Sequence, residues 1–322
     1  MSYITEKETL LKTQVYPQTK KPDFGEFWQR AVKELREAPL TITRERLKTP
    51  FDSTFLTDRL TYTTHDDTKV VAFFSYPAGA QGKLPCLIWY HGGSVRKEIH
   101  PEVLATGVCC LAIDVRAQGG ETIDHAVYTS GDVNGGLMTR GILDPENHYL
   151  RNIYLDAIRA VDCAALLPEV DAARIVTYGG SQGGALSIVA SALSGKSRKC
   201  YTFVTSYCCL WRRTELGSRI FKSVHDYLEG YPEHTDRVRD NLTYFDMINM
   251  VSLLKVPASF ALALSDDVCL PEFVYSAYAH APCEKEITLH PFSPHTTPAA
   301  YKERVLFELA DLRGLGLPER ED

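Results

Sequence analysis

Short apolar runs alternate with segments of helical periodicity along most of the chain. The runs that predict strands span residues 86–90, 108–114, 174–178, 202–205, 258–264 and 286–289. The segments that predict helices span residues 150–167, 184–193, 244–254, 272–279 and 299–312. This alternation is typical of βαβ units, so we expect a mainly parallel, twisted sheet flanked by helices. Ligands then bind at the carboxyl ends of the strands.

The N-terminal part follows a different pattern. Residues 55–76 predict two antiparallel strands joined by a turn at His65-Asp66-Asp67, which would form one edge of the sheet. Before them, a helix is expected at about residues 23–37, packed on the outside of the sheet. Its apolar residues recur at helical spacing and are Phe27, Trp28, Ala31, Val32 and Leu35.

Two segments lack the βαβ pattern. The first insertion, about residues 118–145, is rich in Gly, Asp and Thr and has no strong periodicity. The second insertion, about residues 208–243, is charged and predicted to be helical. We expect both to cover the active face. No repeat or linker divides the chain, so we expect one domain over residues 1–322.

Composition narrows the class of partner. The chain is 44% hydrophobic and 24% charged, as is typical of globular proteins. Its 35 basic and 41 acidic residues give a formal net charge of −6, which offers no general attraction to nucleic acid or to anionic membranes. This balance favours a small neutral or cationic partner. No window approaches the roughly 18 apolar residues that a membrane span requires.

The N-terminus and the cysteines both predict a cytoplasmic protein. The first residues contain no basic and apolar pattern of a signal peptide. The nine cysteines are an odd number and include the vicinal pairs Cys109-Cys110 and Cys208-Cys209. Most lie in apolar runs, where a reduced thiol packs as a small hydrophobic group.

A candidate nucleophile lies in the middle of the chain. The apolar strand ending at Tyr178 leads into Gly179 to Gly184 (G-G-S-Q-G-G), and a helical segment follows. This is the G-x-S-x-G motif in its strand–turn–helix context, which predicts that Ser181 is the nucleophile of an α/β-hydrolase. The flanking glycines would be needed because side chains there would collide with neighbouring backbone. The alternative is a glycine-rich turn with an incidental serine.

A serine nucleophile needs a histidine base, and in this fold the histidine comes last along the chain. His295 is the best candidate because it follows the last strand in a loop, whereas the other downstream histidines lie elsewhere. His225 and His234 are in the second insertion, His280 ends a helix, and His290 is within or beside the strand. The alternative is that His295 is a solvated loop residue.

The acid should follow the strand at 258–264, where Asp266 and Asp267 stand. A buried aspartate would accept the imidazole Nδ1–H, fix the tautomer and stabilise the imidazolium. Spacing does not separate the two residues. The alternative for either one is the N-cap of the helix that begins near Pro271.

The anion-stabilising donors are expected beside the nucleophile. His91-Gly92-Gly93 ends a strand and is similar to the loop that supplies one oxyanion N–H group, while the backbone of Gln182 would supply the other. The alternative is an ordinary turn at the end of a strand. No H-E-x-x-H motif and no paired C-x-x-C motif occurs, so no metal site is predicted.

Taken together, these motifs resemble the acetyl xylan esterase and cephalosporin C deacetylase family, carbohydrate esterase family 7. The resemblance runs from about Phe24 to the C-terminal helix. The matching pieces are residues 114–119 (similar to R-G-Q-G), residues 179–184 (G-G-S-Q-G-G), residues 266–269 before a histidine-bearing loop, residues 136–145 and residues 244–246.

This resemblance implies roles for five residues. Ser181 would be the nucleophile, Asp266 the acid and His295 the base, with the backbone N–H groups of Tyr90 and Gln182 as the oxyanion hole. It also implies removal of acetyl groups from small acylated sugars and cephalosporin C, no cofactor, and a hexameric ring.

Some positions depart from the family pattern. These departures bear on the shape of the acyl pocket and on substrate preference. Ala117 replaces a glycine and His91 stands where asparagine is usual. Residues 204–207 (V-T-S-Y) and 296–298 (T-T-P) also differ from the family's usual residues. Two other functions are compatible with the motifs: a serine peptidase-like hydrolase of the prolyl oligopeptidase type, and a hydrolase-like protein that binds ligands without catalysis.

Overall fold

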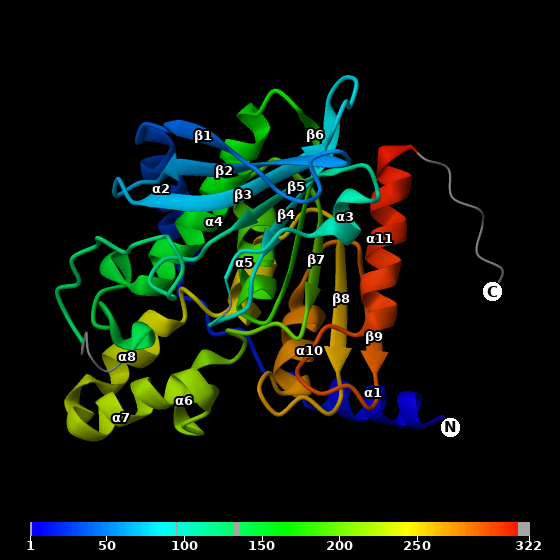
Figure 1. Ribbon diagram of the computed structural model, residues 1–322. Coiled ribbons are helices and arrows are strands. Elements are labelled where there is room, and N and C mark those ends of the chain that lie inside the picture. The colour runs from blue at the N-terminus through cyan, green and yellow to red at the C-terminus, as the bar shows by residue number, and fades with distance from the viewer. Residues whose placement is uncertain (1, 95, 132–135, 315–322) are drawn as a thin grey trace.

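The computed structural model describes residues 2–94, 96–131 and 136–314. Residues 132–135 of the first insertion therefore lie outside the described part. Nine strands of this part form one sheet in the order β1-β2-β3-β5-β4-β6-β7-β8-β9 (Figure 1). The strands are β1 (Ile42–Leu47), β2 (Phe55–Thr63), β3 (Lys69–Pro77), β4 (Leu84–Tyr90), β5 (Cys109–Ile113), β6 (Val170–Gly180), β7 (Ser197–Phe203), β8 (Ala258–Ala263) and β9 (Lys285–His290).

The type of strand pairing changes once across the sheet, from antiparallel to parallel at β5. The first three strands pair in antiparallel fashion, and β3 also runs antiparallel to β5. From β5 to β9 every pairing is parallel. The mixed α/β architecture with a mostly parallel sheet confirms the expected fold class, and the antiparallel pair β2–β3 confirms the hairpin expected at residues 55–76.

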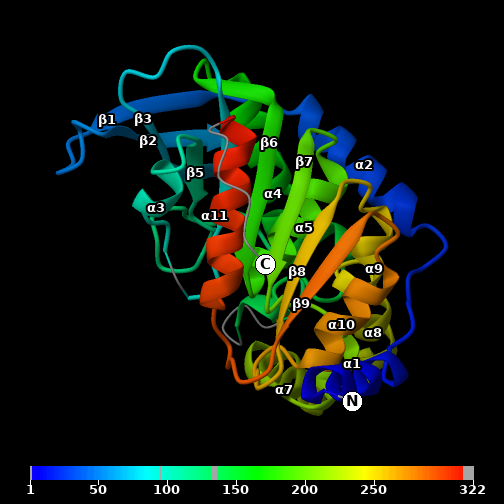
Figure 2. The same ribbon diagram turned by 90° about the vertical axis from the view of Figure 1, so that its right-hand side faces the viewer.

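The sheet separates two layers of helices. Figure 2 shows α3 and α11 on one face, and α2, α4, α5, α9 and α10 on the other. The helices and helical turns are α1 (Tyr3–Thr13), α2 (Phe24–Glu37), α3 (Pro101–Leu104), η1 (Leu137–Thr139), η2 (Pro145–Asn147), α4 (Tyr149–Leu166), α5 (Gln182–Leu193), α6 (Leu210–Glu215), η3 (Arg219–Phe221), α7 (Lys222–Gly230), η4 (Pro232–His234), α8 (Thr235–Leu242), α9 (Met247–Met250), η5 (Val251–Leu253), α10 (Pro271–His280) and α11 (Ala299–Arg313).

Successive side chains of strand β4 point to opposite faces of the sheet, and both sets are apolar, which explains why helices cover both faces. Cys86 and Ile88 pack into the large cluster that contains α2, α4 and α5, while Leu87 between them packs into the cluster that contains α3 and α11. A strand that is apolar on both faces requires a helix layer on each side. Apolar runs without alternation therefore mark the centre of this sheet.

Several predicted boundaries were wrong by a few residues. The helix expected at 244–254 begins only at Met247, because the Asp246 carboxylate accepts the Ile248 N–H and caps the helix there. The strand expected at 202–205 is β7 and ends at Phe203, since the next residue, Val204, has a φ of 40°. The helix expected at 23–37 is confirmed as α2. No helix in the described part of the chain is long and apolar enough to cross a membrane.

Candidate active site

Ser181 occupies a sharp turn between β6 and α5. Its backbone has φ 55° and ψ −123°, a conformation that L residues rarely adopt. Two backbone hydrogen bonds hold it there: its N–H donates to the Phe203 carbonyl at 3.1 Å, and its own carbonyl accepts the Ser206 N–H at 2.9 Å. The strained conformation is therefore fixed by the end of the neighbouring strand β7.

The glycines around Ser181 are required by close packing. A Cβ on Gly183 would overlap the carbonyl oxygen of Tyr90, and a Cβ on Gly179 would overlap the Gly183 carbonyl group. A Cβ on Gly180 would overlap the ring of Phe203. The steric reason expected for these glycines is therefore confirmed.

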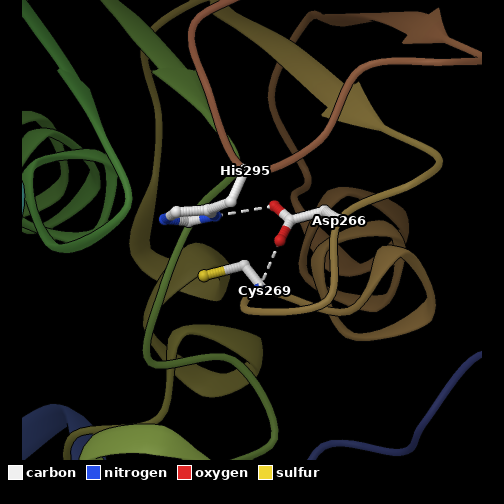
Figure 3. A group of neighbouring side chains, drawn as sticks. All are labelled: Asp266, Cys269 and His295. Atoms are coloured by element: carbon white, nitrogen blue, oxygen red, sulfur yellow. Dashed lines mark hydrogen bonds and ion pairs between the residues drawn. The ribbon is translucent and has the colours of Figure 1, made fainter.

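His295 and Asp266 meet beyond the ends of β8 and β9. The His295 Nδ1 atom lies 2.8 Å from Asp266 Oδ2, and Figure 3 shows the carboxylate facing the imidazole ring. The other oxygen, Asp266 Oδ1, accepts the backbone N–H groups of Val268 at 2.8 Å and Cys269 at 2.9 Å. Asp266 is buried, and these donors fix its orientation.

Asp267 lies in a different environment. Its side chain is 77% exposed and pairs with Arg219 at 2.9 Å. Neither aspartate caps helix α10, whose N-cap residue is Leu270. The sequence left the two residues equivalent by spacing, whereas in the structure only Asp266 contacts His295.

Electrostatics around His295 favour its charged form. Burial lowers the pKa of the ring, but the hydrogen bonds with Asp266 and with the Cys269 thiol outweigh it, so the pKa of His295 is raised above its ordinary value. Such a ring binds a proton readily, and the aspartate then stabilises the resulting imidazolium.

Asp266, Cys269 and His295 also have the side-chain types of a metal site. Their candidate ligand atoms all lie within 4.8 Å of one another (Figure 3). However, both oxygens of Asp266 already accept hydrogen bonds, from backbone N–H groups and from the imidazole. A metal ion would have to break the contact between Asp266 and His295, so the donor set fits a hydrogen-bonded pair better than a metal centre.

Ser181 and His295 line the same cavity, which has a volume of about 770 Å³. It lies at the carboxyl ends of the parallel strands, as expected for this architecture. Residues of the second insertion, including Arg213 and Ile220, form part of its wall. Figure 1 shows α6 and α7 beyond the end of β7, so the second insertion covers the active face as predicted.

The two predicted oxyanion donors belong to elements next to the turn at Ser181: Tyr90 pairs with Gly179 of β6, and Gln182 begins α5. Gln182 is the first residue of α5, where a backbone N–H has no partner within the helix and the helix dipole favours negative charge. Tyr90 is the last residue of β4, and its hydroxyl donates to the Ala157 carbonyl at 2.8 Å, so its side chain points into the protein core. Any role of Tyr90 in binding the oxyanion would therefore fall to its backbone N–H.

Comparison with known families settles the relationship. The family model described as acetyl xylan esterase (AXE1) matches residues 7–311, nearly the whole chain. The chain belongs to the acetyl xylan esterase family. This confirms the resemblance found in the sequence, and the members of this family are carboxylic ester hydrolases.

Solved structures of other family members superpose closely. The acetyl xylan esterase from Paenibacillus sp. R4 is 32% identical, with a TM-score of 0.89 over 94% of this chain and 98% of that one. Acetyl xylan esterase 1 from Thermoanaerobacterium sp. JW/SL YS485 is 26% identical, with a TM-score of 0.86 over 97% of this chain and 99% of that one.

A relative compared by sequence is acetyl esterase Axe7A of Xylanibacter ruminicola. It is 26% identical over 298 residues, which are 87% of this chain and 65% of that esterase's length.

The sequence resemblance implies asparagine at the position of His91, and the contacts of His91 explain how the fold accommodates a histidine there. The His91 Nε2 atom accepts the Val115 N–H at 2.9 Å, and Nδ1 lies 2.7 Å from the Gly92 carbonyl, to which it donates. Burial lowers the pKa of His91, which favours this neutral tautomer. The imidazole thus ties the loop after β4 to the loop after β5.

The motif that resembles the family's R-G-Q-G has a structural explanation that the sequence did not provide. Arg116 is fully buried, and its guanidinium pairs with Asp66, Asp124 and Asp156. The Gln118 amide exchanges two hydrogen bonds with the Gln182 side chain, at 2.7 and 3.1 Å. Because Gln182 follows the serine directly, Gln118 helps to hold the start of α5 in place, while Arg116 ties the same loop to α4 through Asp156.

Backbone strain is concentrated at this site. Eight non-glycine residues of the described chain have a positive φ, and five of them line the cavity. One of the five is Ala117, at φ 62°, where the sequence resemblance implies a glycine. Such conformations are costly and cluster at functional sites. The five residues are Ser94, Ala117, Ser181, Tyr207 and Arg219.

Proposed function

We propose that this chain hydrolyses acetyl esters through a covalent acetyl-enzyme, with Ser181 as nucleophile, His295 as base and Asp266 as the acid that orients it. The main support is the geometry of Ser181, which is strained at the end of β6 and opens on the cavity that His295 also lines. The 2.8 Å contact with Asp266 uses His295 Nδ1, so Nε2 is the ring nitrogen that would accept the serine proton.

The reaction follows from these positions. Ser181 Oγ attacks the acetyl carbonyl carbon while His295 Nε2 takes the hydroxyl proton, and Asp266 stabilises the imidazolium. The backbone N–H groups of Tyr90 and Gln182 would bind the oxyanion. When the intermediate collapses, the alcohol leaves with the proton from His295. Water then attacks the acetyl-enzyme with the same base, releasing acetate and restoring Ser181.

The proposed substrates are small acetylated sugars or oligosaccharides and esters like cephalosporin C. Family membership and the related acetyl xylan esterases support an acetyl group as the acyl part. No cofactor is required, since the nucleophile, base and hydrogen-bond donors of the mechanism are all groups of the protein.

Acyl-chain length provides the test. We expect 4-nitrophenyl acetate to be cleaved much faster than the butyryl ester and the octanoyl ester to be cleaved slowest, because a poorly fitted methylene changes specificity by about 1–3 kcal/mol. A preference for octanoyl esters would contradict the deacetylase assignment. Faster cleavage of the matching 4-nitroanilide amides would favour the peptidase-like alternative, and no turnover of any substrate would favour a binding protein.

We further propose a cytoplasmic homohexamer. The family resemblance supports the assembly. The nine cysteines, all unpaired and eight of them buried, support a reducing compartment. Light scattering of the purified protein tests the assembly, and a monomer would contradict it.

A further inference from the structure

The cavity beside Ser181 is rich in arginine. Arg96, Arg213 and Arg219 line it together with His295, and none of the described lining residues is an aspartate or glutamate. The whole chain carries a formal net charge of −6, from which the sequence favoured a neutral or cationic partner. The local charge at the cavity is therefore opposite in sign to the charge of the protein.

Arg213 is the most informative of the three. It lies on α6 and is only 1% exposed, yet it has no ion pair with a described carboxylate. One guanidinium nitrogen donates to the Val268 carbonyl at 3.0 Å, and its buried Nε has no hydrogen-bond partner. A buried cation is costly unless it is paired, so an arginine left in this state beside a cavity has capacity for an anion.

The carboxylate of Asp246 lies in the same region but does not fill this role. Its two oxygens accept the backbone N–H groups of Cys209, Leu210 and Ile248. Through these hydrogen bonds, Asp246 caps the N-termini of helices α6 and α9. Asp246 forms no ion pair with Arg213 among the described residues, although the charge of Arg213 acts to lower the pKa of this buried carboxyl group. The Arg213 guanidinium also lies over the Phe221 ring, 5.3 Å from its centroid, but this contact supplies no negative charge.

The other two arginines lie at the exposed rim of the cavity. The Arg219 side chain is 52% exposed and pairs with Asp267 at 2.9 Å, and its backbone is strained at φ 52°. Arg96 is exposed and has no ion pair among the described residues. Both can approach a ligand without unfolding any buried structure.

We propose that the substrates preferred by this site are acetyl esters whose alcohol part carries a carboxylate, such as acetylated uronic acid residues. The proposal rests on the function proposed above, because it concerns the alcohol side of the same cavity. A guanidinium binds a carboxylate through two parallel hydrogen bonds, which gives both affinity and orientation. Arg213 would hold the carboxylate, and Arg96 and Arg219 would attract it electrostatically.

Two substrates of similar shape test the charge preference. For each enzyme variant, kcat/KM is measured for 3-acetoxybenzoate and for the uncharged 3-acetoxybenzamide, and the charge preference is the ratio of the two. We expect this ratio in the native enzyme to exceed the ratio of the two uncatalysed hydrolysis rates, and to fall as salt is raised, because ions screen exposed charges. A ratio equal to the uncatalysed one at low salt would overturn the proposal.

Substitutions then assign the preference to particular residues. Arg213→Gln should lower the ratio on the order of tenfold, the value of one charge-assisted hydrogen bond, mainly through KM for the benzoate. Arg96→Gln and Arg219→Gln should lower it less. Asp267→Asn should raise it, because it removes the carboxylate that neutralises Arg219.

A matched control and a second readout keep the test decisive. Arg30→Gln is the control for Arg219→Gln. The Arg30 side chain is 59% exposed, similar to the 52% of Arg219, and pairs with Glu146, but it does not line the cavity, so the ratio should not change. If Arg213 only braced the Val268 loop, Arg213→Gln would slow both substrates equally. That result would overturn the proposal. If Arg213→Gln does not fold, the test rests on Arg96→Gln and Arg219→Gln, and unchanged ratios in both variants would overturn the proposal. Absence of turnover of both substrates by the native enzyme would instead contradict the proposed function.

Discussion

The turn at Ser181 and the second insertion both line the cavity, but different forces hold them. At the turn, the backbone is fixed by packing so close that Gly179 and Gly183 admit no Cβ. In the second insertion, short helices are held partly by exposed ion pairs, such as that between Arg219 and Asp267. Exposed pairs contribute little stability, so the exposed rim of this wall can change at small cost.

This difference suggests that one part of the site carries out the chemistry and another part selects the substrate. In the proposed mechanism, the turn and the loop of Asp266 position the groups that act on the acetyl carbonyl, which is common to all substrates. The second insertion contributes Arg213 and Arg219, which line the same cavity and which we propose bind the variable alcohol part. Changes at the turn should therefore affect every substrate, whereas changes in the second insertion should affect some substrates more than others.

The largest effect is expected at the nucleophile and base. Ser181→Ala and His295→Ala should each lower kcat by several orders of magnitude on charged and uncharged acetyl esters alike, because members of a triad act as a unit. Steady-state kinetics and circular dichroism of the purified variants provide the measurement. Near-native turnover by folded Ser181→Ala would end the assignment.

A smaller but still large effect separates the two neighbouring aspartates. Asp266→Asn should lower kcat by roughly 10³–10⁴-fold, since an amide in place of the carboxylate no longer fixes the imidazole tautomer. Asp267→Asn should leave kcat for the uncharged ester nearly unchanged, because this side chain is exposed and contacts Arg219. The reverse order of damage would assign the acid to Asp267.

The pH profile should show the smallest of the three effects. His295 must be neutral to accept a proton, so kcat/KM should rise with pH through the pKa of this ring. Burial lowers that pKa and the hydrogen bonds with Asp266 and Cys269 raise it more, so the rise should lie above the ordinary histidine value of 6.5. It should be the same for charged and uncharged esters. A rise centred below pH 6 would contradict the role of the His295–Asp266 pair.

The sequence predicted the parts of the molecule whose signals are local. Apolar runs located the central strands, and G-x-S-x-G located the turn because its glycines are dictated by nearby backbone. Strand β1 was missed since it is an exposed edge strand, held to β2 partly by the ion pairs of Arg44 and Arg46 with Asp58. Helix α1 was missed because it buries only Leu11.

The positive charge of the cavity could not be predicted from sequence patterns. Arg96 precedes Arg213 by more than a hundred positions, and only the folded chain brings both to the nucleophile. Total charge was misleading here, because the acidic residues that outnumber the basic ones lie elsewhere. Asp266 and Asp267 were likewise separated only by the fold, which buries the first against His295 and exposes the second.

The central claim is that Ser181 is the activated nucleophile, and covalent labelling tests it most directly. The native enzyme is treated with an organophosphonofluoridate, residual acetyl esterase activity is followed, and the modified peptide is located by mass spectrometry. We predict one label per chain, on Ser181, with activity lost in proportion to labelling, and much slower labelling of His295→Ala. Labelling of a different residue, or full activity in a chain completely labelled at Ser181, would contradict the account.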